Sequence, residues 1–238
     1  MQRLACLLAL LLLLLALAAP AGAATPRDYI RMSDERTRTW SAYVNRSTWV
    51  RSAPSRTARR RALLRELTYH GAPEVVVVLG SAKVDGTDWF HVRYSGLGRR
   101  RGWVPAAALE LDRMIDTRLV LDLRARRLKL MRGRRVLFST PVGIGAAGSP
   151  TPRGQYFIRE RLGPFRSANS IYGALAFGTS AYSPHRTDWP GGGQVGVHGT
   201  NQPGLIPGRI SNGCVRLRNS AVLRLGRMLR VGTPWTVR

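Results

Sequence analysis

Short runs of strand-forming residues, separated by glycine, proline and other turn residues, recur along most of this chain of 238 residues. Such runs favour antiparallel strands joined by tight turns. The run EVVVVL at residues 74–79 suits a buried strand, and DWFHVRY at residues 88–94 alternates in polarity as a half-buried strand does. Further runs lie at residues 102–105, 119–123, 128–131, 135–142, 155–158 and 233–237. We therefore predict a mainly β fold.

Helical periodicity is clearest near the C-terminus. Val222, Leu225 and Leu229 are spaced to form one apolar stripe, and Ser220 is the residue expected to cap the N-terminus of this helix. The segment RRRALLREL at residues 59–67 suits either a helix or a loop. The prediction is thus a mainly β chain with one or two helices.

Changes in composition divide the chain into segments. Residues 1–23 form a leader, and residues 24–46 form an arginine-rich segment that we interpret as a basic tether without an assigned fold. Residues 47–111 hold the first group of strands and residues 117–238 the second. The charged stretch 110–116 is interpreted as the linker between them.

The leader has the three parts of a secretory signal peptide. Arg3 precedes an apolar run at residues 7–19, and the small residues Ala21, Gly22 and Ala23 follow it. The run is shorter than the roughly 20 residues that a membrane-spanning helix needs. We therefore predict cleavage after Ala23 and an exported, extracytoplasmic protein. An uncleaved leader that anchors the chain to the membrane is the alternative.

The formal net charge of +25 calls for an anionic partner or for extensive solvation. Almost all the basic residues are arginines, with Lys83 and Lys129 as the only lysines, and they are spread along the whole chain. A compositional bias towards arginine explains this, and an anionic polymer of the cell envelope is the second explanation. Nucleic acid is not the expected partner, because an exported protein rarely meets it.

Cys214 is the only cysteine outside the predicted leader, since the other is Cys6. Exported proteins usually hold cysteines in pairs, because an oxidising compartment joins them. The count alone leaves three roles open for Cys214: a buried residue, an intermolecular disulfide or a reactive thiol.

A histidine motif and the cysteine motif lie close together in the sequence. His198 opens the segment HGTNQPG, and Cys214 lies within SNGCVRL. A thiol needs a neighbouring base or positive charge to become a nucleophile at neutral pH, and His198 can be that base. Gly213 lets backbone N–H groups converge as an oxyanion hole requires, and Arg216 adds positive charge. The four histidines show no metal-ligand spacing, so we predict no metal.

The sequences of these motifs resemble the L,D-transpeptidase catalytic domain of the YkuD type. H-G-T followed by S-x-G-C-V-R-L carries the resemblance, with the SPTPRG turn at residues 149–154 and the glycines at residues 191–193, and it covers residues 117–238. Residues 47–111 resemble bacterial SH3-like domains through G-x-x-W-x-x-V at residues 86–92 and GWVP at residues 102–105. The resemblances imply a small SH3-like β-barrel followed by an L,D-transpeptidase-type β-sandwich or barrel.

The first resemblance also implies a mechanism without a cofactor. The Cys214 thiolate would attack a peptidoglycan stem peptide, release D-alanine and form a thioester, which an amine of a neighbouring stem would resolve into a crosslink. His198 would move the protons. The N–H groups of Gly213 and Cys214 would hold the oxyanion, with Arg216 stabilising its charge.

One position departs from the family pattern. Many members have a histidine before the glycine of the cysteine motif, where this chain has Asn212. We therefore assign the base to His198 and expect the carbonyl of Gly199 to orient its imidazole. The expected substrate contacts are Ser211, Asn212, Tyr182 and Trp189.

Two other functions stay open at this point. A carboxypeptidase or hydrolase would use water as the acceptor in place of an amine. A non-catalytic wall-binding protein would act through its SH3-like domain alone. The sequence does not distinguish the acceptor or the preferred diamino acid.

Overall fold

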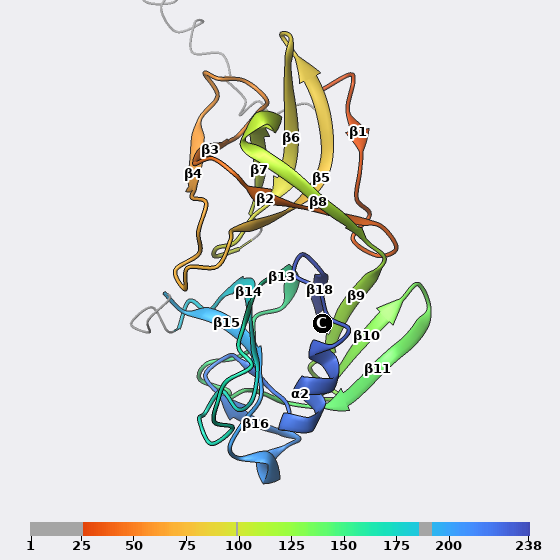
Figure 1. Cartoon of the computed structure of the whole chain (residues 1–238), viewed down its shortest axis with the longest axis vertical. Helices are drawn as coiled ribbons and strands as arrows, with labels where there is room; N and C mark the ends of the chain where they lie inside the picture. Colours follow the sequence, from red (N-terminus) through yellow and green to blue (C-terminus); the bar gives the residue numbers. More distant parts are fainter. Residues whose placement is uncertain (1–25, 99, 186–191) are drawn as a thin grey trace, which may run out of the picture.

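The computed structural model describes residues 26–98, 100–185 and 192–238, so the predicted leader lies outside the described residues. Two β-sheets lie one above the other along the longest axis of the molecule (Figure 1). We call them the N-terminal sheet (β1–β8) and the C-terminal sheet (β9–β18). The mainly β fold is confirmed. None of the helices in the described part of the chain has the length and apolar character needed to cross a membrane.

The N-terminal sheet has the strand order β4-β3-β7-β6-β5-β2-β8, with β1 beside β5. Its long central strand β5 contains residues 75–79 of the predicted EVVVVL run, which are buried because Val76 and Val78 face the core of this sheet while Val77 and Leu79 face the C-terminal sheet. The resemblance of this part to SH3-like domains stays a prediction. The strands are β1 (Ile30–Arg31), β2 (Thr39–Val44), β3 (Thr48–Arg51), β4 (Arg60–Leu64), β5 (Val75–Val84), β6 (Thr87–Arg93), β7 (Arg101–Pro105) and β8 (Leu109–Ile115), with a 3₁₀ turn, η1 (Ala106–Ala108), before β8.

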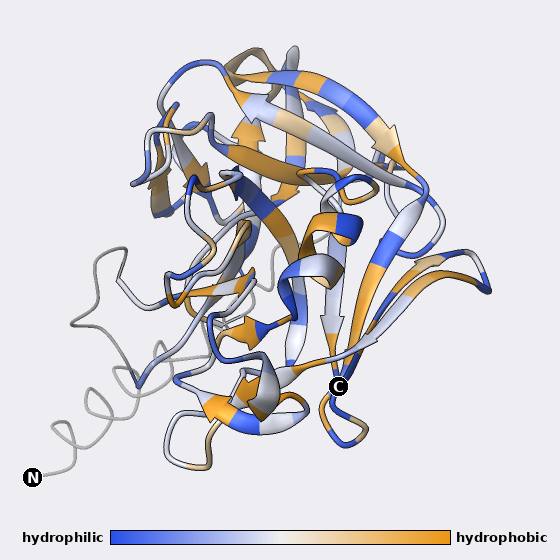
Figure 2. Cartoon of the chain, turned by 60° about the horizontal axis from the view of Figure 1, so that its bottom comes forward, coloured by the Kyte–Doolittle hydropathy of each residue, from blue (hydrophilic) through white to orange (hydrophobic). Residues whose placement is uncertain are grey.

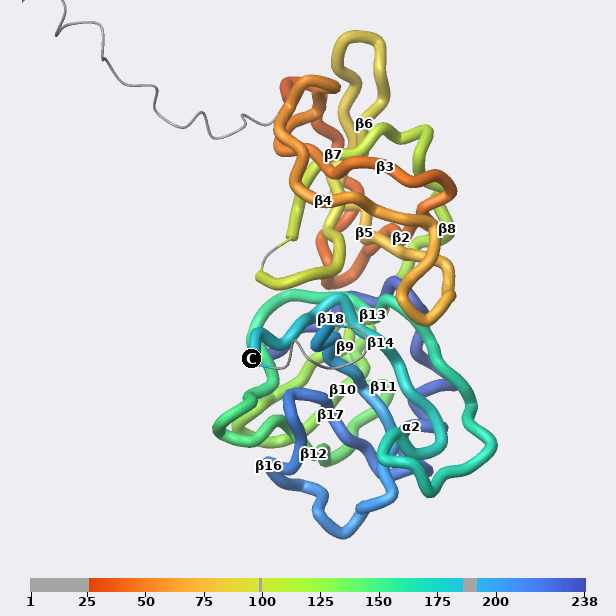
Figure 3. The backbone as a smooth tube through the Cα atoms, turned by 90° about the vertical axis from the view of Figure 1, so that its left-hand side faces the viewer, coloured from red at the N-terminus to blue at the C-terminus, as the bar shows by residue number. Residues whose placement is uncertain are grey.

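Two segment boundaries differ from the sequence prediction. Strand β2 lies within the predicted tether, yet it pairs with both β5 and β8 in the middle of the N-terminal sheet. It joins the sheet because Ala42 and Val44 are buried in the core of that sheet. The predicted linker is mostly strand β8, and only Asp116 separates β8 from β9. The chain therefore passes directly from one sheet to the other, as the tube in Figure 3 shows.

The C-terminal sheet has the order β11-β10-β9-β18-β13-β14-β15-β17-β12-β16. Its strand β18 pairs in parallel with β9 and antiparallel with β13, which joins the two ends of this half of the chain. The strands are β9 (Thr117–Asp122), β10 (Arg127–Arg132), β11 (Arg135–Pro141), β12 (Gly143–Gly145), β13 (Gly154–Leu162), β14 (Ala176–Tyr182), β15 (Gln194–His198), β16 (Gly208–Ser211), β17 (Val215–Arg216) and β18 (Pro234–Val237), with a 3₁₀ turn, η2 (Pro203–Leu205), before β16.

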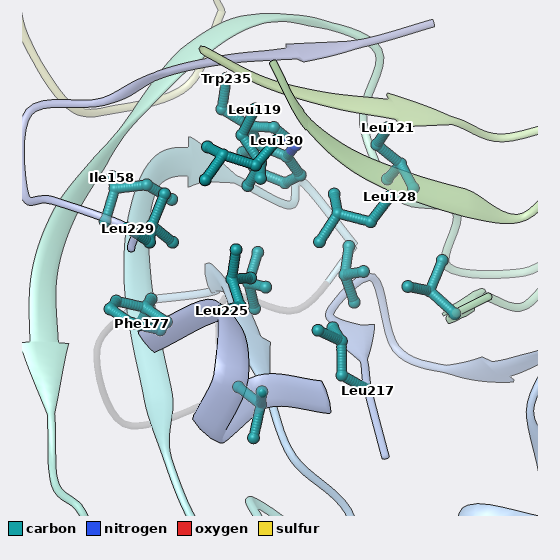
Figure 4. Packing of buried hydrophobic residues seen from close by; sticks show 14 of the residues in the cluster. Leu119, Leu121, Leu128, Leu130, Ile158, Phe177, Leu217, Leu225, Leu229 and Trp235 are labelled. Atoms are coloured by element: carbon teal, nitrogen blue, oxygen red, sulfur yellow. The ribbon is translucent and has the colours of Figure 1, made fainter. Parts of the chain in front are cut away.

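The core of the C-terminal sheet follows from the alternation of apolar and polar residues along its strands (Figure 2). Leu119 and Leu121 of β9 face Leu130 and Leu128 of β10 and are fully buried. Figure 4 shows them packing with Trp235 and with side chains of the helix. This core supports the strands that carry the histidine and cysteine motifs.

The described residues contain one α-helix, α2 (Asn219–Gly226). Val222 and Leu225 are fully buried, as the predicted stripe requires. The expected boundaries were wrong: Ser220 lies inside the helix, and Arg218 occupies the N-cap without a side-chain hydrogen bond. Leu229 is buried beyond the end of the helix, because the chain turns back towards β18 there.

The two sheets meet through β5 and β13. Phe157 of β13 is fully buried and packs against Val77 and Leu79 of β5. The guanidinium of Arg93 donates to the carbonyl oxygen of Gln155 at 3.3 Å. The sheets are thus joined by a small apolar contact flanked by polar ones.

Candidate active site

Cys214 lies immediately before β17, which pairs in parallel with the end of β15. This pairing brings the cysteine motif beside the histidine motif. The Cys214 sulfur accepts the backbone N–H of Gly196 in β15 at 3.3 Å. The preceding residue, Gly213, has φ +111°, a conformation that favours glycine and turns the chain into β17.

His198 is the last residue of β15 and is buried, with 3% of its surface exposed. Its Nδ1 lies 2.6 Å from the carbonyl oxygen of Gly199. Because a carbonyl oxygen only accepts, Nδ1 carries the hydrogen and Nε2 keeps a lone pair able to take a proton. The ring of Tyr172 meets the imidazole edge to face, with 5.2 Å between the ring centres.

The side chains of Cys214 and His198 approach the same point. A Cβ atom on Gly196 would lie 3.5 Å from Cδ2 of His198 and 3.8 Å from the sulfur of Cys214. The absence of a side chain at this position leaves the space between the thiol and the imidazole open. The fold therefore places both residues of the predicted pair in one site.

Burial keeps both groups uncharged near neutral pH. It raises the pKa of the Cys214 thiol, although the Gly196 N–H and the Arg216 charge act in the opposite direction. It lowers the pKa of His198 from 6.5 to about 4, although the hydrogen bond to Gly199 opposes this change. The site therefore rests as a thiol beside a neutral imidazole.

The turn before Cys214 is fixed by two hydroxyl groups. The Ser211 hydroxyl donates to the Cys214 carbonyl at 2.5 Å and accepts the N–H of Gly213 at 3.3 Å. The Thr151 hydroxyl donates to the Gly213 carbonyl at 2.9 Å and accepts the N–H of Gly145 at the same distance. The Gly213 N–H, an expected oxyanion donor, thus points to Ser211 in this structure.

Besides the Gly213 N–H, the guanidinium of Arg216 is a candidate oxyanion donor in the site. Its Nη1 donates to the side chain of Gln202 at 3.3 Å. Its Nε is buried and has no hydrogen-bond partner among the described residues. A buried donor without a partner is costly, so Nε is well suited to receive an oxygen of a bound molecule.

Both motifs open into a cavity of about 500 Å³. Cys214, His198 and Arg216 line it, and most of the remaining wall is apolar. A largely apolar cavity with a few convergent polar groups is the usual form of a ligand site. The apolar wall is formed mainly by Leu162, Phe165, Ile171, Tyr172, Phe177 and Val195.

Only some of the expected substrate contacts line the cavity. Ser211 and Asn212 line the cavity. Tyr182 is not among the described residues that line it, and its hydroxyl accepts instead from Nη1 of Arg159 at 2.9 Å. Trp189 lies outside the described residues.

Asn219, which sequence reasoning did not single out, supports the histidine motif. Its side-chain oxygen accepts the N–H groups of Ala174 and Thr200, both at 3.1 Å. It thereby ties the residue after Gly199 to the segment that precedes β14. Its position directly after the cysteine motif, at the start of a helix, was the one available signal.

No cluster of three or more histidine, cysteine, aspartate or glutamate side chains able to hold a metal occurs in residues 26–98, 100–185 and 192–238.

The matches to known proteins lie in the second half of the chain. A family model described as the L,D-transpeptidase catalytic domain, YkuD, matches residues 116–237. The protein named as L,D-transpeptidase YkuD of Bacillus subtilis (strain 168) is 28% identical over 123 residues, which are 52% of this chain and 66% of that protein. Its namesake in Bacillus licheniformis is 31% identical over 123 residues, 50% of this chain and 64% of that protein. The chain thus spans slightly less than two thirds of these relatives.

Solved structures give similar matches. The structure of Bd1075 from Bdellovibrio bacteriovorus is 29% identical and covers 51% of this chain and 47% of that one, with a TM-score of 0.41. The NMR structure of the catalytic domain of the E. faecium L,D-transpeptidase is 21% identical and covers 52% of this chain and 97% of that one, with a TM-score of 0.38. Because the family model matches half of the chain, this protein belongs to the L,D-transpeptidase catalytic domain (YkuD) family.

Proposed function

We propose that this protein is an exported cysteine transpeptidase that crosslinks peptidoglycan stem peptides through an acyl-enzyme on Cys214. The observation that carries the proposal is the approach of a half-buried thiol and a neutral imidazole to one open point at Gly196, inside the cavity of a member of this family.

Acylation begins with proton transfer from the thiol to His198. The imidazole can take this proton because Nδ1 is held by the carbonyl oxygen of Gly199, which leaves the lone pair of Nε2 available. The thiolate sulfur then attacks the carbonyl carbon before the terminal D-alanine. The proton passes from His198 to the departing D-alanine amine, and a thioester remains on Cys214.

The tetrahedral intermediate carries a negative oxygen that needs donors. The buried Nε of Arg216 is free to donate, and the Gly213 N–H can do so once it leaves Ser211. Each donor of this kind typically stabilises the transition state by about 3 to 4 kcal/mol. The Arg216 charge adds to this stabilisation and also favours the thiolate.

The second half of the reaction decides between two enzyme classes. An amine from a neighbouring stem attacks the thioester carbon, transfers its proton to His198 and releases the thiol as a crosslink forms. Water in place of the amine would make the protein a carboxypeptidase. Both reactions share the acyl-enzyme, so the products distinguish them.

Export is part of the proposal. The leader motif at residues 1–23 and the peptidoglycan substrate class both support an extracytoplasmic site of action. An anionic polymer of the envelope is the partner that the net charge of +25 favours. A role as a non-catalytic wall-binding protein is disfavoured by the assembled thiol and imidazole.

The decisive experiment incubates the purified protein with a disaccharide tetrapeptide and weighs the products. A dimer with the mass of two donors less one D-alanine and no added water supports transpeptidation. If tripeptide is the only product, the protein is a hydrolase. A carbapenem provides an independent check, because the adduct must map to Cys214; an adduct elsewhere, or none, contradicts the nucleophile assignment.

A further inference from the structure

The cavity that holds Cys214 extends to a loop of the N-terminal sheet. Its lining includes Tyr69 and His70, which lie between β4 and β5. An isolated bridge between Leu67 and Pro73 closes this segment, which we call the 67–73 loop. The N-terminal sheet therefore supplies one wall of the cavity that contains the nucleophile.

Glu160 of β13 fixes this loop to the C-terminal sheet. Its carboxylate is fully buried and accepts the Thr68 hydroxyl at 2.7 Å. It also lies 3.1 Å from Nδ1 of His70 and accepts the side-chain amide of Gln194 at 3.0 Å. Three partners from two sheets thus satisfy one buried carboxylate, and Gln194 itself lines the cavity.

A β-bulge in β13 adds a second contact between β13 and the N-terminal sheet. Ile158 pairs with Thr179 and Glu160 with Gly178, so Arg159 is the extra residue between two paired positions. Its guanidinium binds the carboxylate of Glu74, which follows the 67–73 loop. Two consecutive residues of β13 therefore hold the same part of the N-terminal sheet.

The strand order gives the approximate distance from Cys214 to the 67–73 loop. Cys214 lies beside β17, and the path across the sheet then passes β15 and β14 to β13, where Glu160 holds His70. Three steps between neighbouring strands amount to about 14 Å. The three stem residues before the reacting carbonyl span about 10 Å when extended. The 67–73 loop therefore lies where the sugar attached to the stem would lie.

The two side chains suit a sugar ring. The Tyr69 side chain is 69% exposed, and its ring stands edge to face against that of His70, with 5.2 Å between their centres. A phenol ring offers an apolar face and a polar edge, which match the C–H face and the hydroxyl rim of a sugar. Because the Nδ1 of His70 faces Glu160, its Nε2 remains for a ligand hydroxyl.

We propose that Tyr69 and His70 form a glycan subsite that binds the sugar-linked end of the donor stem peptide. The inference rests on the proposed function, because it takes its ligand from the same reaction. It assigns substrate recognition to a loop outside the part of the chain that the family model matches.

The test measures D-alanine release from a disaccharide tetrapeptide and from the free tetrapeptide. Tyr69→Ala should raise KM for the disaccharide tetrapeptide by about three- to tenfold, while kcat and the KM for the free tetrapeptide stay unchanged. The rate at which iodoacetamide alkylates Cys214 should also stay unchanged. Leu67→Ala is the matched control, because Leu67 is 57% exposed in the same loop and is not among the described residues that line the cavity.

An equal change in KM for both substrates, or no change for either, overturns the subsite, as does the same effect from Leu67→Ala. If the unmodified protein releases D-alanine from neither substrate, the proposed function fails instead. Calorimetry on Cys214→Ala then tests the subsite separately. Binding of the disaccharide tetrapeptide that Tyr69→Ala weakens by the same factor supports it, and binding that Tyr69→Ala leaves unchanged contradicts it.

Discussion

The C-terminal sheet holds two buried groups of polar side chains, one around Cys214 and His198 and one around Arg159 and Glu160. In the first group, burial moves both pKa values towards the neutral forms. In the second group, burial alone would lower the pKa of Arg159, but the carboxylate of Glu74 raises it above its ordinary value. The protein thus keeps its two reacting side chains uncharged at rest and fixes charge where its two sheets meet.

This difference reflects what each group has to do. A buried ion pair holds its partners only while both stay charged, which suits a permanent contact. A buried thiol and imidazole develop charge only when a substrate supplies a carbonyl to attack and an oxyanion to stabilise. Substitutions in each group, together with pH titration, test whether the two groups are as separate as their electrostatics indicate.

The largest expected effect is the loss of turnover without a loss of stability. Cys214→Ala removes the only nucleophile that we assign, so D-alanine release should fall by about a thousandfold or more. Its melting temperature should stay close to that of the unmodified protein, because the sulfur has few polar contacts beyond the Gly196 N–H. Product mass spectrometry and thermal unfolding check the two parts, and residual turnover near the original rate would contradict the assignment.

Removing one partner of the charged group should lower the stability of the fold. Glu74→Gln leaves Arg159 buried without its counter-charge, which typically costs about 3 to 5 kcal/mol of unfolding free energy. The matched control is Asp116→Asn, because the pair of Asp116 with Arg132 is about half exposed and should contribute less than about 1 kcal/mol. Urea unfolding measures both variants; equal, small changes would show that the buried pair does not hold the sheets together.

Acid should destabilise the protein through His198. Its pKa is about 4 in the folded chain and 6.5 when unperturbed, so the unfolded chain takes up the proton first as the pH falls. The stability is therefore complete above about pH 6.5 and decreases towards pH 4, by about 3 kcal/mol for this group. His91, whose pKa burial also lowers to about 4, adds an effect of the same sign.

Unfolding curves between pH 4 and pH 7 test this, with His198→Gln as the comparison. The variant should lose less stability over this range than the unmodified protein does. Identical pH dependence in the two proteins would mean that His198 is not held neutral by burial.

The smallest expected effect concerns the resting thiol. Because burial raises the pKa of Cys214, iodoacetamide should alkylate it more slowly at pH 7 than it alkylates a free cysteine, and the rate should climb into the alkaline range. Arg216→Gln should shift this profile slightly further towards high pH, since the Arg216 charge favours the thiolate. A plateau of fast alkylation near neutral pH would instead indicate a preformed thiolate and imidazolium pair.

Much of the site was predictable because its parts are close in sequence. Only sixteen positions separate His198 from Cys214, and a parallel pairing of the short strands β15 and β17 is enough to join their motifs. The alternation of apolar residues likewise predicted the mainly β fold, because a half-buried strand shows its inner face directly in the sequence.

The remaining features depend on contacts that the sequence does not display. The tether assignment failed because β2 follows an arginine-rich stretch, and its pairing with β5 and β8 is not visible in the sequence, although TWSAYV is rich in strand-forming residues. The part that Tyr69 and His70 play in the cavity could not be anticipated, since it depends on Glu160, about ninety residues later, and on a one-residue bulge.

The bulge in β13 has a consequence for engineering. Exchanging the N-terminal sheet for another module looks simple, because the family model begins only at residue 116. Yet consecutive residues of β13 contact Thr68 and Glu74 of the N-terminal sheet, and a replacement module without equivalents would leave Arg159 without its counter-charge and Glu160 without two of its three partners. A functional chimera therefore has to transplant the loop with the catalytic part, or delete the extra residue together with its charge.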